Sequence, residues 1–332
     1  MRFQPGLYKS LTGYFLRNTF SGRKRFPLVL MLEPTHRCNL ACIGCDRIRT
    51  AAGGDLSVSR CVKAAEECGA PVVAVTGGEP ALYGELVPLV NELLARGKYI
   101  YLCTNGLLTA DFIESFHADP RLTLNFHLDG MEKTHDEITN RPGTFRTALQ
   151  SIILAKKKGY RVSTNTTVYR NSDLGELEKL FELLSALKVD GILISPAFAY
   201  QSVENDIFFT RREIAEKFRQ ISAFPKKFPF INTPVYMDFL KGDREMACTP
   251  WGNPTYNPLG WKSPCYLITD GYFDTYKEMM ESTSWEKYEN RKDPRCENCM
   301  VHGGYETTVM RIAFSNPREL VRLALWNMHR KN

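Results

Sequence analysis

Short runs of β-branched residues alternate with amphipathic stretches between residues 27 and 200, and this alternation limits the fold more than any other feature. Each run has the length of a strand, and several are apolar almost throughout, as strands covered on both faces are. Strands that alternate with helical stretches predict a parallel sheet with crossover helices. The six expected strands are residues 27–32, 71–76, 99–104, 122–128, 161–169 and 191–195.

The stretches between these strands carry apolar residues at helical spacing. One helix is expected over residues 86–94, with Gly97 just beyond its end. Asp173 is expected to begin another by accepting a backbone N–H. A further helix near residues 210–223 would close the barrel. We therefore predict an α/β fold, a partial (β/α)6 TIM-like barrel.

The composition changes after the barrel, where Pro, Gly, aromatic residues and Cys become frequent. Such a region has a thin core of its own, and a bound metal cluster can supply the missing stability. We expect four parts: a basic amphipathic segment at 1–26, the barrel at 27–225, a small cysteine-rich domain at 226–303 and a basic C-terminal helix at 304–332.

Ten cysteines indicate metal or redox chemistry in a compartment that keeps thiols reduced. No apolar run reaches the roughly 18 residues of a spanning helix, and the beginning of the chain has no secretory signal pattern. We therefore expect a cytoplasmic protein. The net charge of +6 comes mainly from the two ends, so the main body gives no indication of nucleic-acid binding.

Cys38, Cys42 and Cys45 follow the first expected strand and place three thiolates on one short loop. Cubane clusters normally take four cysteine ligands, so a local set of three suggests a [4Fe-4S] cluster with one iron left for another ligand. The alternative is structural zinc. Zinc sites usually use paired CxxC knuckles, and the barrel region has no second pair.

The sequence Gly77-Gly78-Glu79-Pro80 follows the second expected strand. Ligand groups gather at the carboxyl ends of parallel strands, so the cysteine loop and this turn are expected to face one another. Together the two motifs resemble the radical S-adenosylmethionine (SAM) superfamily over about residues 27 to 200. The resemblance implies that the loop binds the cluster and that Gly77, Gly78 and Glu79 meet the amino group of SAM. Gly44 departs from the superfamily, which usually has an aromatic residue before the third cysteine.

The resemblance also implies a reaction. One electron, from a donor such as flavodoxin or ferredoxin, passes through the cluster into the SAM sulfonium and forms a 5′-deoxyadenosyl radical. Further SAM contacts are implied at the other strand ends, and the alternative for each is a satisfied polar group inside a barrel. These residues are Asn105, His127, Asp129, Asn165 and Ser195, with Thr104 and Thr167 nearby.

The late cysteines resemble the twitch or SPASM domains that follow radical SAM barrels and hold an auxiliary cluster. Four thiolates favour a second, fully ligated [4Fe-4S] cluster, and tetrahedral zinc is the alternative. They are Cys248, Cys265, Cys296 and Cys299. His302 is nearby, and we interpret it as a surface residue rather than a ligand.

Strings along nearly the whole chain resemble the adenosylhopane synthase family of hopanoid biosynthesis. In that family the radical adds to the alkene of a triterpene, so the resemblance implies a transferase that forms a carbon–carbon bond on a lipid. Residues 46–49 and Gly303 depart from that family, which leaves another isoprenoid open as the substrate. The strings include PLVLMLEPTHRCNLACIGC, YLCTNGLL, VDGILISPAFAY, MACTPWGNPTYNPLGW and CENCMVHGG.

Cys103 gains a candidate role from this resemblance. Addition to an alkene leaves a carbon radical, and a thiol is a good hydrogen-atom donor because its S–H bond is weak. The family's reducing cysteine falls at Cys103, near the active end of the third strand. The alternative is a small buried side chain that only packs.

A lipid substrate would make the basic ends relevant. The apolar residues of both ends are expected either to lie on the inner face of a membrane or to cap the barrel. They are Leu7, Leu11, Tyr14 and Phe15 at one end, and Leu320, Leu323, Leu325 and Trp326 at the other. A peptide-modifying radical SAM enzyme and a non-catalytic iron–sulfur or zinc protein are the competing functional hypotheses.

Overall fold

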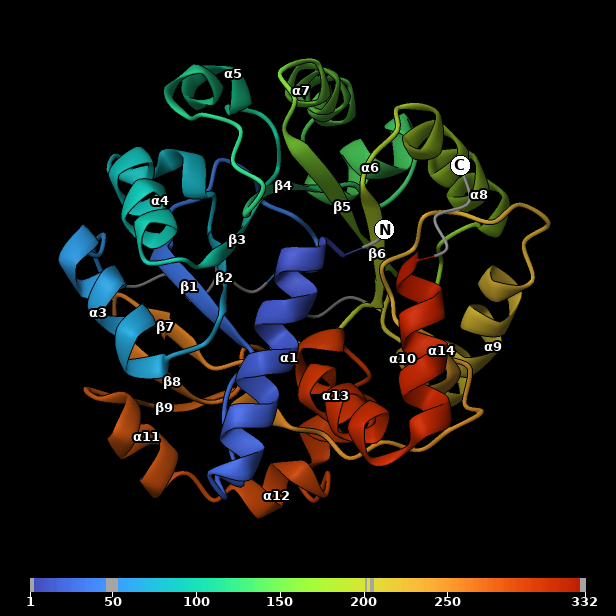
Figure 1. Ribbon diagram of the computed structural model, residues 1–332. Helices are drawn as coiled ribbons and strands as arrows, with labels where there is room; N and C mark the ends of the chain where they lie inside the picture. Colours follow the sequence, from blue (N-terminus) through green and yellow to red (C-terminus); the bar gives the residue numbers. More distant parts are fainter. Residues whose placement is uncertain (1–2, 46–52, 201, 204–205, 329–332) are drawn as a thin grey trace.

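The computed structural model describes residues 3–45, 53–200, 202–203 and 206–328 (Figure 1). Residues 46–49 and the terminal cations Arg2, Arg330 and Lys331 lie outside these ranges. The six predicted strands form, as neighbouring parallel strands, the greater part of a nine-stranded sheet. They are β1 (Val29–Thr35), β2 (Val72–Gly77), β3 (Tyr99–Thr104), β4 (Leu122–His127), β5 (Arg161–Val168) and β6 (Gly191–Pro196). The predicted α/β fold is confirmed.

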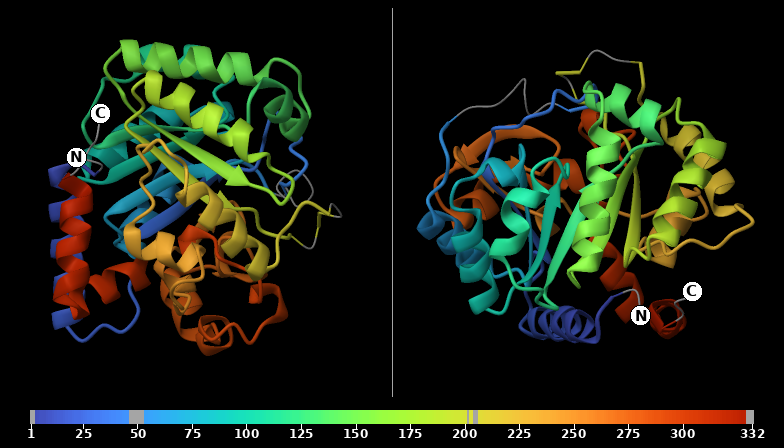
Figure 2. Two further views of the ribbon diagram at one scale, coloured as in Figure 1. Left: turned by 90° about the vertical axis from the view of Figure 1, so that its right-hand side faces the viewer. Right: turned by 90° about the horizontal axis from the view of Figure 1, so that it is seen from above.

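Helices cover the outer side of the parallel strands (Figure 2). The predicted helix ends are present: Gly97 has φ +72°, and the Asp173 side chain accepts from the Glu176 amide. Thr210 and Glu213 form a capping box. The helices are α3 (Val58–Cys68), α4 (Leu86–Ala95), α5 (Thr109–Phe112), α6 (Glu132–Thr139), α7 (Thr144–Lys157), α8 (Leu174–Ala186) and α9 (Arg211–Ser222).

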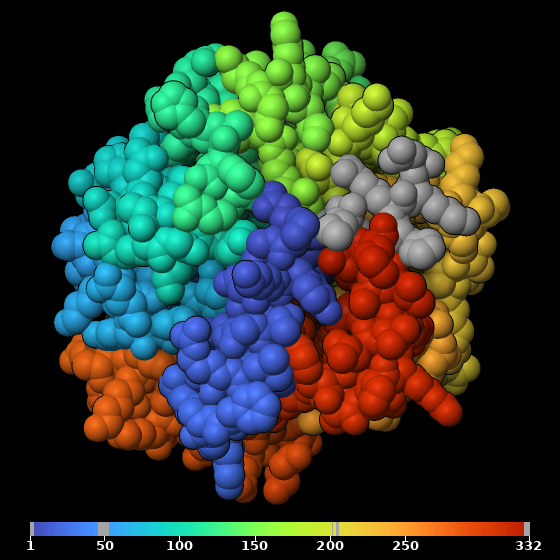
Figure 3. Space-filling model, in the orientation of Figure 1, coloured from blue at the N-terminus to red at the C-terminus, as the bar shows by residue number. Residues whose placement is uncertain are grey.

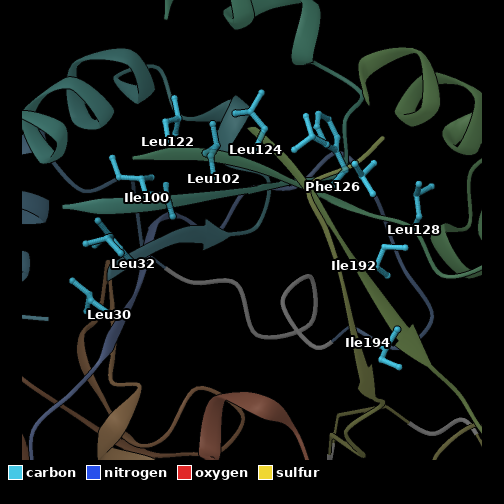
Figure 4. Packing of buried hydrophobic residues seen from close by; sticks show 14 of the residues in the cluster. Leu30, Leu32, Ile100, Leu102, Leu122, Leu124, Phe126, Leu128, Ile192 and Ile194 are labelled. Carbon is cyan, nitrogen blue, oxygen red and sulfur yellow. The ribbon is translucent and has the colours of Figure 1, made fainter. Parts of the chain in front are cut away.

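The main hydrophobic core lies between the parallel strands and these helices. Figure 4 shows alternate residues of the strands, such as Leu102, Leu124 and Ile194, in this layer, and all three are fully buried. The residues between them face the other way, into the barrel interior, because side chains alternate along a strand. Cys103 is one of these interior residues, and it lies beside Asn125 in the register of β3 and β4.

The cysteine-rich region extends the same sheet. β7 (Thr255–Asn257) pairs with β1 in parallel, and β8 (Gly260–Pro264) and β9 (Thr269–Phe273) continue the sheet as antiparallel strands. The helices α11 (Tyr276–Ser282) and α12 (Trp285–Glu289) follow the strands, and α10 (Pro234–Leu240) precedes them. The predicted domain boundary at residue 226 stays a prediction, and the sheet is continuous across it.

The two terminal segments pack side by side (Figures 1 and 3). They form α1 (Pro5–Phe20), α13 (Glu306–Ser315) and α14 (Pro317–Met328). Phe15 stacks on Phe314 with ring centroids 5.0 Å apart, and Phe3 contacts Trp326. Leu7, Phe15 and Leu323 are buried. All three are among the residues expected from the sequence either to contact a membrane or to cap the barrel.

These helices lie at the amino ends of the strands, because α1 is in contact with Tyr99 at the start of β3 and with Phe26 just before β1. This position agrees with the capping interpretation of the basic ends. Membrane contact stays a prediction. Within the described ranges, no helix combines the length and the apolar character needed to cross a bilayer.

Candidate active site

The loop after β1 carries the first three cysteines and lies against the turn after β2. The Gly78 amide donates to the Thr35 carbonyl at 3.0 Å, and the Glu79 amide donates to the Arg37 carbonyl at 2.8 Å. Both acceptors lie within the three residues that precede Cys38. The structure therefore brings the cysteine loop and the GGEP turn together at the carboxyl ends of the strands.

This close approach requires glycine at both positions of the turn. A Cβ on Gly78 would lie 2.0 Å from the Arg37 carbonyl oxygen, and a Cβ on Gly77 would lie 2.4 Å from that of Thr35. Gly77 also has φ +115°, a conformation that other residues rarely adopt. The two glycines therefore allow one backbone to lie directly on the other.

Glu79 is buried and holds this turn onto the end of β3. Its carboxylate accepts from the Thr104 hydroxyl and the Asn105 amide, both at 2.8 Å, and from the Ala81 amide at 3.0 Å. Burial raises the pKa of Glu79, and these donors oppose the rise. The side chain therefore has a structural role that the sequence did not predict, alongside the SAM contact that stays a prediction.

Asn105 connects the same strand end to the cysteine loop. Its side-chain amide donates to the Asn39 side chain at 2.7 Å, and its own side-chain oxygen accepts from the Leu107 amide at 2.9 Å. Asn39 directly follows Cys38 and was not singled out by the sequence, because a lone Asn carries no pattern.

His127 and Asp129 form a pair at the end of β4. His127 Nε2 lies 2.6 Å from an Asp129 carboxylate oxygen, and the other oxygen accepts from the Thr167 amide at 2.7 Å. Burial disfavours the charged imidazole, but the Asp129 carboxylate prevails and raises the pKa of His127. His135 also positions Asp129, because its Nδ1 accepts a hydrogen bond from the Asp129 backbone amide.

The three thiols of the loop are partly buried, and burial and neighbouring thiols raise the pKa of Cys38 and of Cys42. Burial is the main cause that raises the pKa of Cys38 and of Cys42, and neighbouring thiols and the Asp129 carboxylate add to the rise at Cys42. Within the described part of the chain, no three His, Cys, Asp or Glu side chains already stand in the geometry of a single bound metal ion. Three mutually close thiols on one loop, with an ordered turn beside them, are chemically suited to a cluster with one open iron.

Asn165 and Ser195 lie on β5 and β6. Asn165 is next to His127 in the register of β4 and β5, and its buried side-chain oxygen has no hydrogen-bond partner among the described residues. Ser195 is next to Thr167 in the register of β5 and β6. Burial raises the pKa of the Tyr236 hydroxyl on α10, and Ser195 opposes this rise. Ser195 therefore faces the C-terminal region rather than the cysteine loop.

Cys103 lies inside the barrel, one layer below His127. Asn125 donates to the Cys103 sulfur at 3.6 Å, and the Ser163 hydroxyl donates to Asn125 at 2.8 Å. Burial raises the pKa of Cys103 to about 11, so the thiol keeps its hydrogen at neutral pH.

The four late cysteines also come together. The charge of each of the other three thiols contributes to the raised pKa of Cys248, after burial as the main cause. The Arg291 guanidinium acts in the opposite sense on Cys248 and on Cys299. Gly304 lies against this set, because a Cβ there would be 2.8 Å from the Cys248 sulfur. Four convergent thiols suit either the predicted second cluster or a zinc ion.

Two partly buried residues lie near this set. His302, which we interpreted as a surface residue, is half-buried: its Nδ1 is enclosed without a hydrogen-bond partner among the described residues, and burial lowers its pKa to about 4. One carboxylate oxygen of Glu306 is enclosed and has no hydrogen-bond partner among the described residues. Burial raises the pKa of Glu306 to about 7. A single acid in a helical segment gives no sequence signal of burial.

Two sequence profiles match this chain. The profile of the radical SAM superfamily matches residues 32–184, and that of a domain of unknown function, DUF3463, matches residues 192–323. The first match covers the strands and turns that carry the cysteine loop, the GGEP turn and Cys103.

Curated relatives are similar to parts of this chain. An AdoMet-dependent heme synthase of Methanosarcina barkeri is 30% identical over 168 residues, which are 48% of this chain and 48% of the relative. The subtilosin biosynthesis protein AlbA of Bacillus subtilis is 23% identical over 309 residues, 85% of this chain and 66% of the relative. The chain spans about half the length of the first of these relatives. Neither of these relatives is named for hopanoid biosynthesis, so they do not support the hopanoid substrate that the sequence resemblance implies.

Solved structures share the fold. Streptococcus suis SuiB bound to its precursor peptide SuiA has a TM-score of 0.62 at 13% identity and covers 74% of this chain and 61% of its own. The structure of anSMEcpe with bound AdoMet has a TM-score of 0.59 at 16% identity and covers 92% of this chain and 96% of its own. The cysteine loop and the GGEP turn, in contact at the strand ends, lie within residues 32–184, the part of this chain that matches the radical SAM superfamily profile.

Proposed function

We propose that this chain is a radical SAM enzyme that cleaves SAM reductively at the cysteine loop and uses the resulting radical to modify a peptide. The observation that carries the SAM-cleavage part is the direct contact between the two motifs, in which the Glu79 amide donates to the Arg37 carbonyl. Members of the superfamily use a [4Fe-4S] cluster and SAM, and neighbours of this fold bind AdoMet. When bound, the cluster supplies the electron that cleaves SAM.

The residues of this chain divide the remaining tasks. Cys38, Cys42 and Cys45 would hold the cluster. The GGEP turn would receive the amino group of SAM, because its backbone is fixed by Glu79 and by the loop above it. The interior layers of the barrel would exclude water from the space in which the radical would form. Cys248, Cys265, Cys296 and Cys299 would hold the auxiliary cluster.

The peptide part of the proposal is supported by the relatives. AlbA, which aligns with 85% of this chain, is a bacteriocin biosynthesis protein, and SuiB is solved with a precursor peptide. Abstraction of a hydrogen atom from a peptide releases free 5′-deoxyadenosine.

A second candidate, addition of the radical to a triterpene or other isoprenoid alkene, is favoured by Cys103. Its thiol is protonated, lies in the barrel interior and is oriented by Asn125. Such a thiol can give a hydrogen atom to the carbon radical that addition leaves. In this case the adenosyl group stays in the product.

The test is a reaction of the anaerobically reconstituted protein with SAM, a reductant and either the peptide fraction or the lipid fraction of a cell extract. Free 5′-deoxyadenosine that increases with peptide supports the first candidate, and an adenosine-bearing lipid supports the second. The variant with Cys38, Cys42 and Cys45 replaced by Ala should cleave no SAM. Cys61→Ala, at a buried thiol on α3, is the matched control. Cleavage retained in the triple variant would overturn the assignment.

The second candidate also has its own test. Cys103→Ala should still form the adenosine-bearing lipid but give a mixture of epimers or trapped adducts, because the donor thiol is gone. A single epimer at the wild-type rate would remove Cys103 from the mechanism.

A further inference from the structure

Gly44, directly before Cys45, is a glycine for reasons of space. A Cβ at Gly44 would lie 2.6 Å from the Tyr169 hydroxyl oxygen and 2.9 and 3.1 Å from two carbons of its ring. Gly44 is absent from the described residues with positive φ, so its backbone conformation would admit other residues. A Cβ at position 44 would therefore force the Tyr169 ring to shift.

Tyr169 is fixed in that place. It directly follows β5 and is 6% exposed. Its amide donates to the Ser172 hydroxyl at 3.0 Å, and its carbonyl accepts from the Ser172 amide at 3.1 Å. A short turn thus anchors the backbone on both sides, and the ring extends from it toward the cysteine loop.

The hydroxyl of Tyr169 lies beside the stretch of the loop between Cys42 and Cys45, because a Cβ on Gly44 would be 2.6 Å from its oxygen. Burial is the main cause that raises the pKa of Tyr169, and the charges of Asp129, Cys42 and Cys45 raise it further. The phenol is therefore neutral at physiological pH and keeps a hydrogen to donate. Thiolate and sulfide sulfur accept such hydrogen bonds, and these bonds change the reduction potential of a cluster.

We propose that Tyr169 supplies, from β5, the aromatic side chain that position 44 lacks, and that its hydroxyl donates a hydrogen bond to sulfur at the Cys42 and Cys45 side of the cluster. Tyr169 is then a positioning residue for the cysteine loop and for the cluster. The inference deepens the proposed function and rests on it.

Two kinds of variant separate this role from simple packing. Tyr169→Phe keeps the ring and removes the hydroxyl. A donated hydrogen bond stabilises the reduced cluster, which is the more negative state, so the variant should keep its iron but have a lower midpoint potential. The potential is measured by a redox titration followed by electron paramagnetic resonance, on the signal that changes when SAM is added.

The second kind tests the steric pairing. Gly44→Phe alone should lower the iron content because the new side chain and Tyr169 compete for one space. Tyr169→Ala alone should also lower it because the loop loses its support. The double variant, Gly44→Phe with Tyr169→Ala, should regain iron relative to both single variants. Gly84→Ala is the matched control, since a Cβ there has no heavy atom within 4 Å.

The outcomes are distinct. An unchanged potential in Tyr169→Phe overturns the hydrogen bond, and a double variant no better than the single variants overturns the steric pairing. A wild-type protein without any SAM-responsive cluster signal overturns the proposed function itself.

Discussion

At the scale of single residues, Glu79 is where the predicted SAM contact and the observed structure meet. Glu79→Ala leaves the Asn105 and Ala81 amides without their acceptor. An unsatisfied donor costs up to about 1–3 kcal/mol when it is buried, and these two are partly buried, so the turn should loosen as well as lose its carboxylate. We expect a SAM dissociation constant at least about tenfold higher, with a smaller change in iron content. Equilibrium dialysis and iron analysis measure both, and Glu85→Ala, an exposed neighbour, is the control. Unchanged SAM affinity would exclude the role.

Glu306 predicts a pH dependence of stability. Its pKa is 4.5 in an unfolded chain and about 7 in the folded protein because of burial. The folded state therefore binds more protons between these values, and the free energy of unfolding should fall as the pH rises through this window. Between pH 5.5 and 8 the loss should be about 2 kcal/mol.

Glu306→Gln, which has no charge to bury, should remove this loss. Urea unfolding of the two proteins at pH 5.5 and 8 measures the difference. If the free energy of unfolding changes equally in wild type and variant between pH 5.5 and 8, the Glu306 carboxylate is solvated and the prediction is wrong.

At the scale of elements, α1 is a test of whether the basic end caps the barrel. Phe15 is 3% exposed and packs on Phe314 and Phe26, whereas Phe20 on the same helix is 85% exposed. Phe15→Ala should therefore lower the free energy of unfolding by about 3–5 kcal/mol, and Phe20→Ala by less than about 0.5 kcal/mol. Denaturant titration without lipid measures both. Equal, small effects would mean that α1 is not a cap.

At the scale of the whole molecule, the two cysteine sets predict about eight irons per chain in two clusters. Replacing Cys38, Cys42 and Cys45 by Ala should leave about four, and so should replacing Cys248 and Cys265. Cys61→Ala should leave the iron content unchanged. Metal analysis and Mössbauer spectroscopy make the measurement. About four irons with one zinc in the wild type would instead assign zinc to the second set.

Much of the fold follows from local pattern. The strand over residues 99–104 is found with the bounds that its β-branched run predicts, and the other five strands differ by a few residues at their ends. The short β7 was not predicted, because a strand of three residues has too few positions to show alternation. Through β7 the predicted cysteine-rich domain shares one sheet with the barrel, and the domain boundary stays a prediction.

The sequence by itself determined which short segments carry the candidate chemistry, because cysteine spacing and a Gly-Gly-Glu turn are properties of short segments. It placed Cys38 and Glu79 at strand ends, where parallel strands must bring them together. Only the tertiary structure decided how each group is held. Glu79 binds Thr104 and Asn105, and Tyr169 fills the space beside Gly44. These contacts join residues far apart in the chain, and their strength depends on burial, which no local pattern records.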